Sequence, residues 1–354
     1  MDIHQLLDGA LASGASDLHL SAHMPPLLRV DGALRPMPGF AALNAAEVGA
    51  MLDAVMDEAG RRQFSERWQN DFSLETPAPA RRRFRVSAYR QRRGPAAVFR
   101  AVAGNVPRPA DLNAPPALGE LALARNGLLL VTGAAGSGKS TTLAALLGHH
   151  AAHRAAHIIT VEDPIEFVHH GSAGADGTSG ALFSQREVHR DTRSFPDALR
   201  AALRADPDVV MVGEVRDTET MRLALTAAET GHLVMATLHT ASAARSVGRV
   251  ADLFPAEEKP LARALLAESL RGVAAQALVK RTTGGRTAAF EILTATHAVR
   301  NLIRENKTAQ IYSAIQSGGG HGMQTLDQSL RALVESGTVD MAEARPLLAE
   351  PGAW

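Results

Sequence analysis

The chain contains no cysteine among its 354 residues, so it forms no disulfide and no thiolate metal site, and a reducing cytoplasm suits it. Aromatic residues make up only 4%. Lysine plus arginine (37) balance aspartate plus glutamate (37), which leaves no net charge to attract nucleic acid or an anionic membrane. No apolar run reaches the roughly eighteen residues of a transmembrane segment, and no signal peptide is expected at the N-terminus. These absences leave a globular protein long enough for two domains.

What stands out is a glycine-rich segment at residues 133–140, which reads Gly-Ala-Ala-Gly-Ser-Gly-Lys-Ser. It follows an apolar run at 127–132 and precedes a helical pattern at 140–147, the context of a phosphate-binding loop. Its glycines let backbone N–H groups turn inward, and the helix N-terminus adds partial positive charge. Lys139 would reach the β- and γ-phosphates, and Ser140 would bind Mg²⁺. The alternative is a glycine-rich turn with a surface lysine.

The pattern divides the chain into two parts. The first hundred residues read as a small α+β domain with helices at 2–13 and 44–68 and strands at 17–20, 27–32, 71–75 and 83–89. Repeated prolines predict a linker at 103–118. From 119 onward, apolar runs at 127–132, 157–161, 209–212 and 233–237 alternate with helices, which favours a parallel sheet covered on both faces. Residues 258–348 read as mostly helical, and the Gly/Ser/Ala stretch 171–180 reads as a mobile loop.

Acidic residues follow two of the apolar runs. Glu162, Asp163 and Glu166 come after 157–161, and Glu214 follows 209–212 in a Walker B arrangement. Carboxyl ends of parallel strands share one edge of the sheet, where nucleotide chemistry takes place in open α/β folds. Acids at these positions can orient Mg²⁺ or an attacking water. Ordinary helix capping is the alternative explanation for the first group.

Two further groups carry charge or titrate near pH 7. His232 and His239 flank the run 233–237. Arg85 lies on the strand face opposite Phe84, and Arg93 follows that strand before a glycine. Taken singly, a strand-end histidine is more often structural and an arginine-rich strand face more often solvated. Behind a phosphate loop, the set together favours nucleotide hydrolysis.

These segments together resemble the secretion-type ATPases, and among them the PilT-type retraction ATPases of bacterial type IV pili. The similarity extends over nearly the whole chain. It is carried by the N-terminal signature at 14–20, the Asp box at 162–166, the Walker B end at 213–214, the His box at 230–239 and a retraction-associated motif at 298–305. The resemblance implies a PAS-like N-terminal domain (1–102) and a RecA-like ATPase domain (119–354) with a helical C-terminal part.

The resemblance also implies roles for single residues. Glu166 would orient or deprotonate the attacking water, Glu214 would act through Mg²⁺ or the water, and His239 and His232 would sense the γ-phosphate or link subunits. Arg85 and Arg93 would act as arginine fingers when the domains close. The metal ligands would be Ser140 and Glu214. ATP and Mg²⁺ would be held by Gly133, Ala134, Ala135, Gly136, Ser137, Gly138, Lys139, Ser140 and Thr141.

The same resemblance implies a homohexameric ring in the cytoplasm, peripheral to the inner membrane at the pilus base. It would act on a membrane-embedded platform protein, beside an accessory retraction ATPase, without direct contact to nucleic acid. Two features depart from the family pattern: Ala134-Ala135 stand where Pro-Thr is usual, and 171–180 looks like an insertion.

Other classes of protein remain open. An extension or type II secretion ATPase would usually carry a tetracysteine zinc module, which this chain lacks. An accessory retraction ATPase, a nucleic-acid motor and a non-hydrolysing structural ring are further alternatives. Neutral charge and the lack of an aromatic-plus-basic stretch disfavour the nucleic-acid motor.

Overall fold

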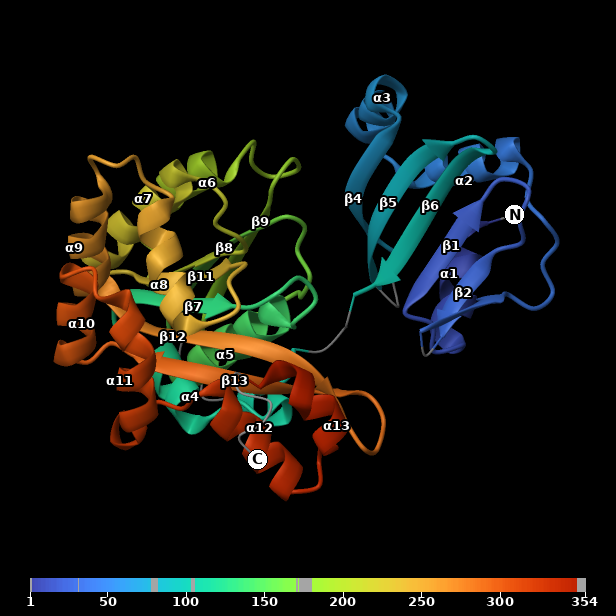
Figure 1. Ribbon diagram of the computed structural model, residues 1–354. Helices are drawn as coiled ribbons and strands as arrows, with labels where there is room; N and C mark the ends of the chain where they lie inside the picture. Colours follow the sequence, from blue (N-terminus) through green and yellow to red (C-terminus); the bar gives the residue numbers. More distant parts are fainter. Residues whose placement is uncertain are drawn as a thin grey trace. The chain divides into compact units, whose positions relative to one another are not determined.

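The structure is a computed structural model that describes residues 2–30, 32–77, 82–102, 106–169, 171 and 180–348. The chain forms two compact units, Met1–Asn105 and Val106–Trp354, each built around its own sheet (Figure 1). The expected linker 103–118 is therefore too long. Residues 103–105 lie outside the described part, but 106–118 belong to the second unit, and Leu118 in helix α4 (Pro116–Ala122) is fully buried. Proline is accommodated there because it occupies the first turn of a helix.

The first unit is an antiparallel sheet with three helices, in the strand order β3-β2-β1-β6-β5-β4. Its helices are α1 (Ile3–Ala12), α2 (Ala45–Val55) and α3 (Glu58–Arg67). Its strands are β1 (Asp17–Ser21), β2 (Leu27–Val30), β3 (Ala33–Pro36), β4 (Gln69–Glu75), β5 (Arg83–Gln91) and β6 (Gly94–Ala101).

Alternation along β5 sets the core of this unit, because Phe84 and Val86 are buried while Arg85 is exposed. The single helix expected at 44–68 is wrong, since two helices are present. Met56 is extended, and the Asp57 side chain accepts a hydrogen bond from the Gly60 N–H and begins α3 as its N-cap.

The second unit has a seven-stranded sheet in the order β13-β12-β7-β11-β10-β8-β9. All neighbouring pairs are parallel except β12 and β13. Its strands are β7 (Gly127–Thr132), β8 (His157–Glu162), β9 (Leu182–Glu187), β10 (Val209–Val212), β11 (Leu233–Leu238), β12 (Leu270–Lys280) and β13 (Arg286–Thr294). Its remaining helices are α5 (Lys139–His153), α6 (Phe195–Ala202), α7 (Thr218–Glu229), α8 (Ala243–Asp252), α9 (Lys259–Ser269), α10 (His297–Arg304), α11 (Ile311–Ser317), α12 (Leu326–Glu335) and α13 (Met341–Ala344).

Helices cover both faces of this sheet, as the near-continuous apolar strands predict. Leu128 and Leu130 of β7 pack with helices α6 to α11, and Leu129 and Val131 pack with α4 and α5. The mixed α/β class with a parallel sheet is thus confirmed. The expectation that 258–348 is mostly helical holds for α9 and for the residues after 296, but it missed β12 and β13, which form the longest strand pair of the sheet. Of the expected mobile loop 171–180, residues 172–179 lie outside the described part.

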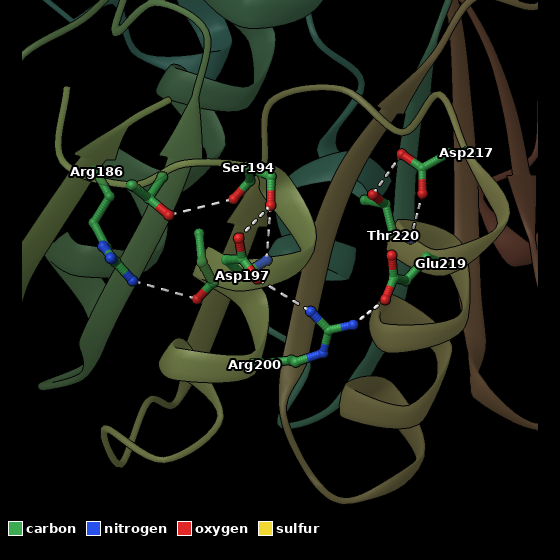
Figure 2. Close-up of polar contacts among 9 residues, drawn as sticks. Arg186, Ser194, Asp197, Arg200, Asp217, Glu219 and Thr220 are labelled. Atoms are coloured by element: carbon green, nitrogen blue, oxygen red, sulfur yellow. Dashed lines mark hydrogen bonds and ion pairs between the residues drawn. The ribbon is translucent and has the colours of Figure 1, made fainter. Parts of the chain in front are cut away.

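Polar contacts fix the ends of α6 and α7 near the carboxyl edge of the sheet (Figure 2). Ser194 and Asp217 are the N-caps of these two helices. Arg200 of α6 binds Asp197 in its own helix and reaches across to Glu219 of α7. This exposed ion pair connects the two helices beside the strand β10, which leads into the candidate site.

Candidate functional site

The glycine-rich loop 133–138 joins β7 to α5 at the carboxyl edge of the sheet. Gly136 and Gly138 have φ angles of 74° and 88°, a left-handed conformation that favours glycine. Gly138 is the N-cap of α5, so the loop passes directly into a fifteen-residue helix. The predicted strand–loop–helix arrangement is therefore present, with the helix N-terminus available to an anion.

Lys139 folds back onto the loop that precedes it. Its Nζ donates hydrogen bonds to the carbonyl oxygens of Gly133 (3.0 Å) and Ala134 (2.8 Å). The residue is 8% exposed, and this burial lowers the pKa of the ammonium, although the charges of Glu214 and Glu166 oppose the shift. The structure thus places a buried cation against the loop, with two carboxylates close enough to act on it.

A line of polar contacts runs from this lysine along the sheet edge. Register explains it: Thr132 of β7 pairs with Leu238 of β11, so His239 follows beside the loop. Nδ1 of His239 lies 3.3 Å from Lys139 Nζ, and Nε2 lies 2.9 Å from Glu214 Oε1. The other carboxylate oxygen of Glu214 accepts a hydrogen bond from Arg216 at 2.7 Å. That bond lowers the pKa of Glu214, so the carboxylate is ionised.

The turn after β8 carries the second acidic group. Glu162 is buried, and burial together with the charge of Glu166 raises the pKa of Glu162. Glu166 is half-buried, and its charge acts on Lys139. The structure therefore brings Lys139, Glu166, Glu214 and His239 to one edge of the sheet.

Strand β9 holds this acidic turn from outside. Gln185 donates to the carbonyl oxygen of Phe167 (2.8 Å) and to Glu162 Oε1 (3.1 Å), and its own oxygen accepts the His169 N–H (2.8 Å). Glu187 accepts the Ile165 N–H at 3.2 Å. Sequence reasoning missed these two residues because β9 was not expected. Gln185 and Glu187 stand two residues apart, so they share one face of a strand, and this spacing was the signal available in the sequence.

His232 lies elsewhere. It precedes β11, and its carbonyl oxygen accepts the N–H of Gly127 at the start of β7. The phosphate loop follows the other end of β7. A six-residue strand is about 20 Å long, so the loop lies about that far from His232. A role for His232 at a γ-phosphate bound to this loop does not fit that position, and a link between subunits stays a prediction.

The two arginines predicted as fingers belong to the first unit. Arg85 lies on the open face of β5, and Arg93 lies in the turn between β5 and β6. Both are exposed. Their part in catalysis stays a prediction.

The predicted Mg²⁺ ligands suit a hard cation. Ser140 and Thr141 lie half-buried in the first turn of α5, and Glu214 offers an ionised carboxylate. In the part of the chain that the structure describes, no three His, Cys, Asp or Glu side chains gather as a metal site. A hydroxyl and one carboxylate are the donors expected where phosphates and water supply the remaining ligands of Mg²⁺.

The retraction-associated motif 298–305 falls mostly on α10. Arg300 donates hydrogen bonds to the carbonyl oxygens of Ala267 (2.8 Å), Leu270 (3.0 Å) and Ala295 (3.0 Å). These bonds cap the end of α9 and tie it to α10. Within the motif, Arg300 therefore has a structural part. None of the described helices is long and apolar enough to cross a bilayer.

Comparison with known proteins identifies the family. The model of the type II/IV secretion system protein family matches residues 1–345. The chain is 51% identical to the type IV pilus retractation ATPase PilT of Pseudomonas aeruginosa over 345 residues, covering 98% of this chain and 97% of the relative. It is 49% identical to a twitching motility protein of Neisseria gonorrhoeae, covering 92% and 84% of the two chains.

Solved structures agree with the sequence relatives. A crystal structure of the pilus retraction motor PilT with bound ADP superposes with a TM-score of 0.90 at 39% identity, covering 100% and 99% of the two chains. The Legionella pneumophila ATPase DotB gives a TM-score of 0.80 at 28% identity, covering 98% and 95%. The chain belongs to the type II/IV secretion system protein family and, within it, to the PilT-type pilus retraction ATPases.

Proposed function

We propose that this protein hydrolyses ATP to ADP and phosphate and that this reaction drives the retraction of type IV pili. The observation that carries the proposal is the buried ammonium of Lys139 beside Glu166, Glu214 and His239 at the phosphate loop. The names of the relatives at 51% and 49% identity support the pilus function.

In the proposed mechanism, the loop 133–141 binds the phosphates, and Lys139 turns from the loop carbonyls to the β- and γ-phosphates. Glu166 orients or deprotonates the attacking water. Ser140 and Glu214 would hold Mg²⁺, which would neutralise charge on the phosphates. Arg85 and Arg93 stabilise the transferred phosphoryl group when the two units close, and His239 responds to the γ-phosphate.

The proposal extends to assembly. A homohexameric ring in the cytoplasm, at the inner membrane below the pilus, would pass the opening and closing of its units to a platform protein. A closed ring completes every site that lies between two subunits. An accessory retraction ATPase is the nearest alternative, since the Pseudomonas aeruginosa ATPase PilU is 37% identical. The higher identity to PilT favours the main retraction enzyme.

Phosphate release with saturating ATP and Mg²⁺ tests the enzyme. We expect steady turnover by the parent and a loss of at least about 10²-fold in Lys139→Ala, because the variant loses the ammonium proposed to bind the β- and γ-phosphates. Equal rates in the two proteins would remove the proposed site. Steady phosphate release by the parent would also exclude the non-hydrolysing ring.

Deletion of the gene tests the pilus function. We expect pili to accumulate on the cell surface, because they would no longer be retracted.

A further inference from the structure

A glutamine on the neighbouring strand reaches the phosphate loop. Strand β12 runs parallel to β7, and Ala275 pairs with Thr132, so Gln276 lies level with Gly133, where the loop begins. Gln276 is only 5% exposed. Its Nε2 donates a hydrogen bond to the carbonyl oxygen of Ser137 in the loop.

The contact between strand and loop is tight. A Cβ atom on Gly133 would lie 2.5 Å from the carbonyl oxygen of Gln276, and one on Gly138 would lie 3.0 Å from its Nε2. A side chain at Gly133 would therefore collide with the backbone of β12, and one at Gly138 would press on the amide of Gln276. The two glycines serve close approach to Gln276 as well as backbone bending.

The hydrogen bond fixes the direction of a neighbouring donor. The Ser137 carbonyl and the Gly138 N–H belong to one planar trans peptide, so they point in opposite directions. With the carbonyl turned toward β12, the Gly138 N–H is turned away from it. This N–H stands at the N-terminus of α5, among the groups that a phosphate would meet.

The remaining polar atoms indicate that packing alone does not explain a glutamine here. Oε1 of Gln276 and Oγ of Ser137 are both buried without a hydrogen-bond partner among the described residues. Ala274 and Leu278, on the same face of β12, belong to an apolar cluster. An apolar side chain of similar size would fill this place without leaving a buried oxygen unpaired. The glutamine is therefore explained by its N–H donor.

We propose that Gln276 is a positioning residue of the phosphate site: its side-chain amide holds the Ser137–Gly138 peptide so that the Gly138 N–H faces a bound polyphosphate. The inference rests on the proposed nucleotide-binding function. Gln276 then acts on affinity, because it preforms the loop without touching the reacting atoms.

The test compares Gln276→Met, which has similar size but no donor, with the matched control Gln324→Met. Gln324 donates to the carbonyl oxygen of Phe290, the residue opposite Gln276 on β13. Each substitution thus removes one amide-to-carbonyl bond that joins this strand pair to a neighbouring segment, and only the bond of Gln276 reaches the loop. The measurements are the Kd of a fluorescent ADP analogue and the KM and kcat for ATP.

We expect Gln276→Met to raise Kd and KM about tenfold with kcat within about twofold, and Gln324→Met to leave all three near the parent values. Gln276→Glu, which turns an acceptor toward the Ser137 carbonyl, should weaken binding further. If thermal unfolding shows that Gln276→Met does not fold, the Kd and KM of Gln276→Glu are compared with the parent values instead. A Kd within about twofold of the parent, or equal losses in both methionine variants, would overturn the inference.

Parent protein and Lys139→Ala separate this inference from the proposed function. Suppose that the parent binds the analogue and Lys139→Ala does not. If Gln276→Met then binds like the parent, only the proposed role of Gln276 is wrong. If the parent does not bind it, the proposed function fails, and the inference fails with it.

Discussion

Lys139 Nζ lies 3.3 Å from Nδ1 of His239, one hundred residues further along the chain. An ammonium can only donate hydrogen bonds, so Nδ1 is the acceptor and the neutral ring carries its proton on Nε2. That N–H then donates to Glu214 at 2.9 Å. One imidazole thus connects the loop lysine to the Walker B carboxylate. If a phosphate draws the lysine away, Nδ1 loses its donor while the bond to Glu214 can persist.

Replacement of His239 by alanine should lower ATP turnover more than nucleotide affinity. The substitution removes the Nε2–H bond, after which, among the described residues, Arg216 remains to orient Glu214. A lost hydrogen bond to a charged group corresponds to a fall of about 10- to 100-fold in kcat. Phosphate release measures this, with His153→Ala as the control, since His153 is an exposed histidine at the other end of α5. Equal rates in the two variants would contradict the role of His239.

Replacement of Glu166 by glutamine should slow turnover at least about 10²-fold while ATP still binds, because the amide cannot accept the proton of the attacking water. Single-turnover hydrolysis and analogue binding measure the two effects separately. Glu229→Gln is the matched control, since Glu229 is an exposed acid at the C-terminal end of α7. Turnover near the parent rate in Glu166→Gln would show that another group activates the water.

Replacement of Gln185 by methionine should lower kcat about tenfold and change the Kd for ADP less than about twofold. The variant loses the bonds to Phe167, His169 and Glu162 that hold the turn carrying Glu166. Ser184→Ala is the control, because it removes a hydrogen bond to His157 from the adjacent position of β9. Equal losses of activity in both variants, or no loss in either, would contradict the role of Gln185.

Replacement of Glu162 by glutamine should stabilise the protein in a pH-dependent way. Burial and the charge of Glu166 raise the pKa of Glu162 above its ordinary value of 4.5, so the folded state holds this proton more tightly than the unfolded state does. The contribution of Glu162 to the free energy of unfolding is fully present below pH 4.5, where the group is protonated in both states. This contribution is lost as the pH rises through the pKa of the folded state. Glutamine has no charge to bury. The difference in Tm between variant and parent should therefore grow above pH 4.5, to about 2 °C or more.

Thermal unfolding of the two proteins across that pH range measures the effect. Glu120→Gln, a change at an exposed residue of α4, is the control and should show no such trend. A difference that stays constant with pH would mean that the pKa of Glu162 is the same in the folded and unfolded states.

The sequence predicts the centre of the sheet well, because strands buried on both faces are apolar throughout. Strands β7, β8, β10 and β11 begin and end within one residue of the expected runs. Strand β9 was not predicted, because it is a polar strand at the edge of the sheet and has no continuous apolar run. Strands β12 and β13 were also missed, because alanine fits a helix as readily as a buried strand, so only their pairing decides.

The same distinction applies to the site. Lys139, Glu166, Glu214 and His239 could be predicted because each is tied to a spacing or to a strand end. Gln185 and Gln276 could not, since a neutral amide forms no motif and its partner carbonyls are set by strand register. His232 precedes the run 233–237, and this order already indicates the amino edge of the sheet, opposite the edge that carries the loop.

The most direct test of the account is a crystal structure with a non-hydrolysable ATP analogue and Mg²⁺. We expect the triphosphate on the loop 133–141, with Lys139 Nζ moved from the carbonyl oxygens of Gly133 and Ala134 to the terminal phosphates. A nucleotide bound elsewhere, or a lysine that keeps both carbonyl bonds while the loop is occupied, would contradict this expectation.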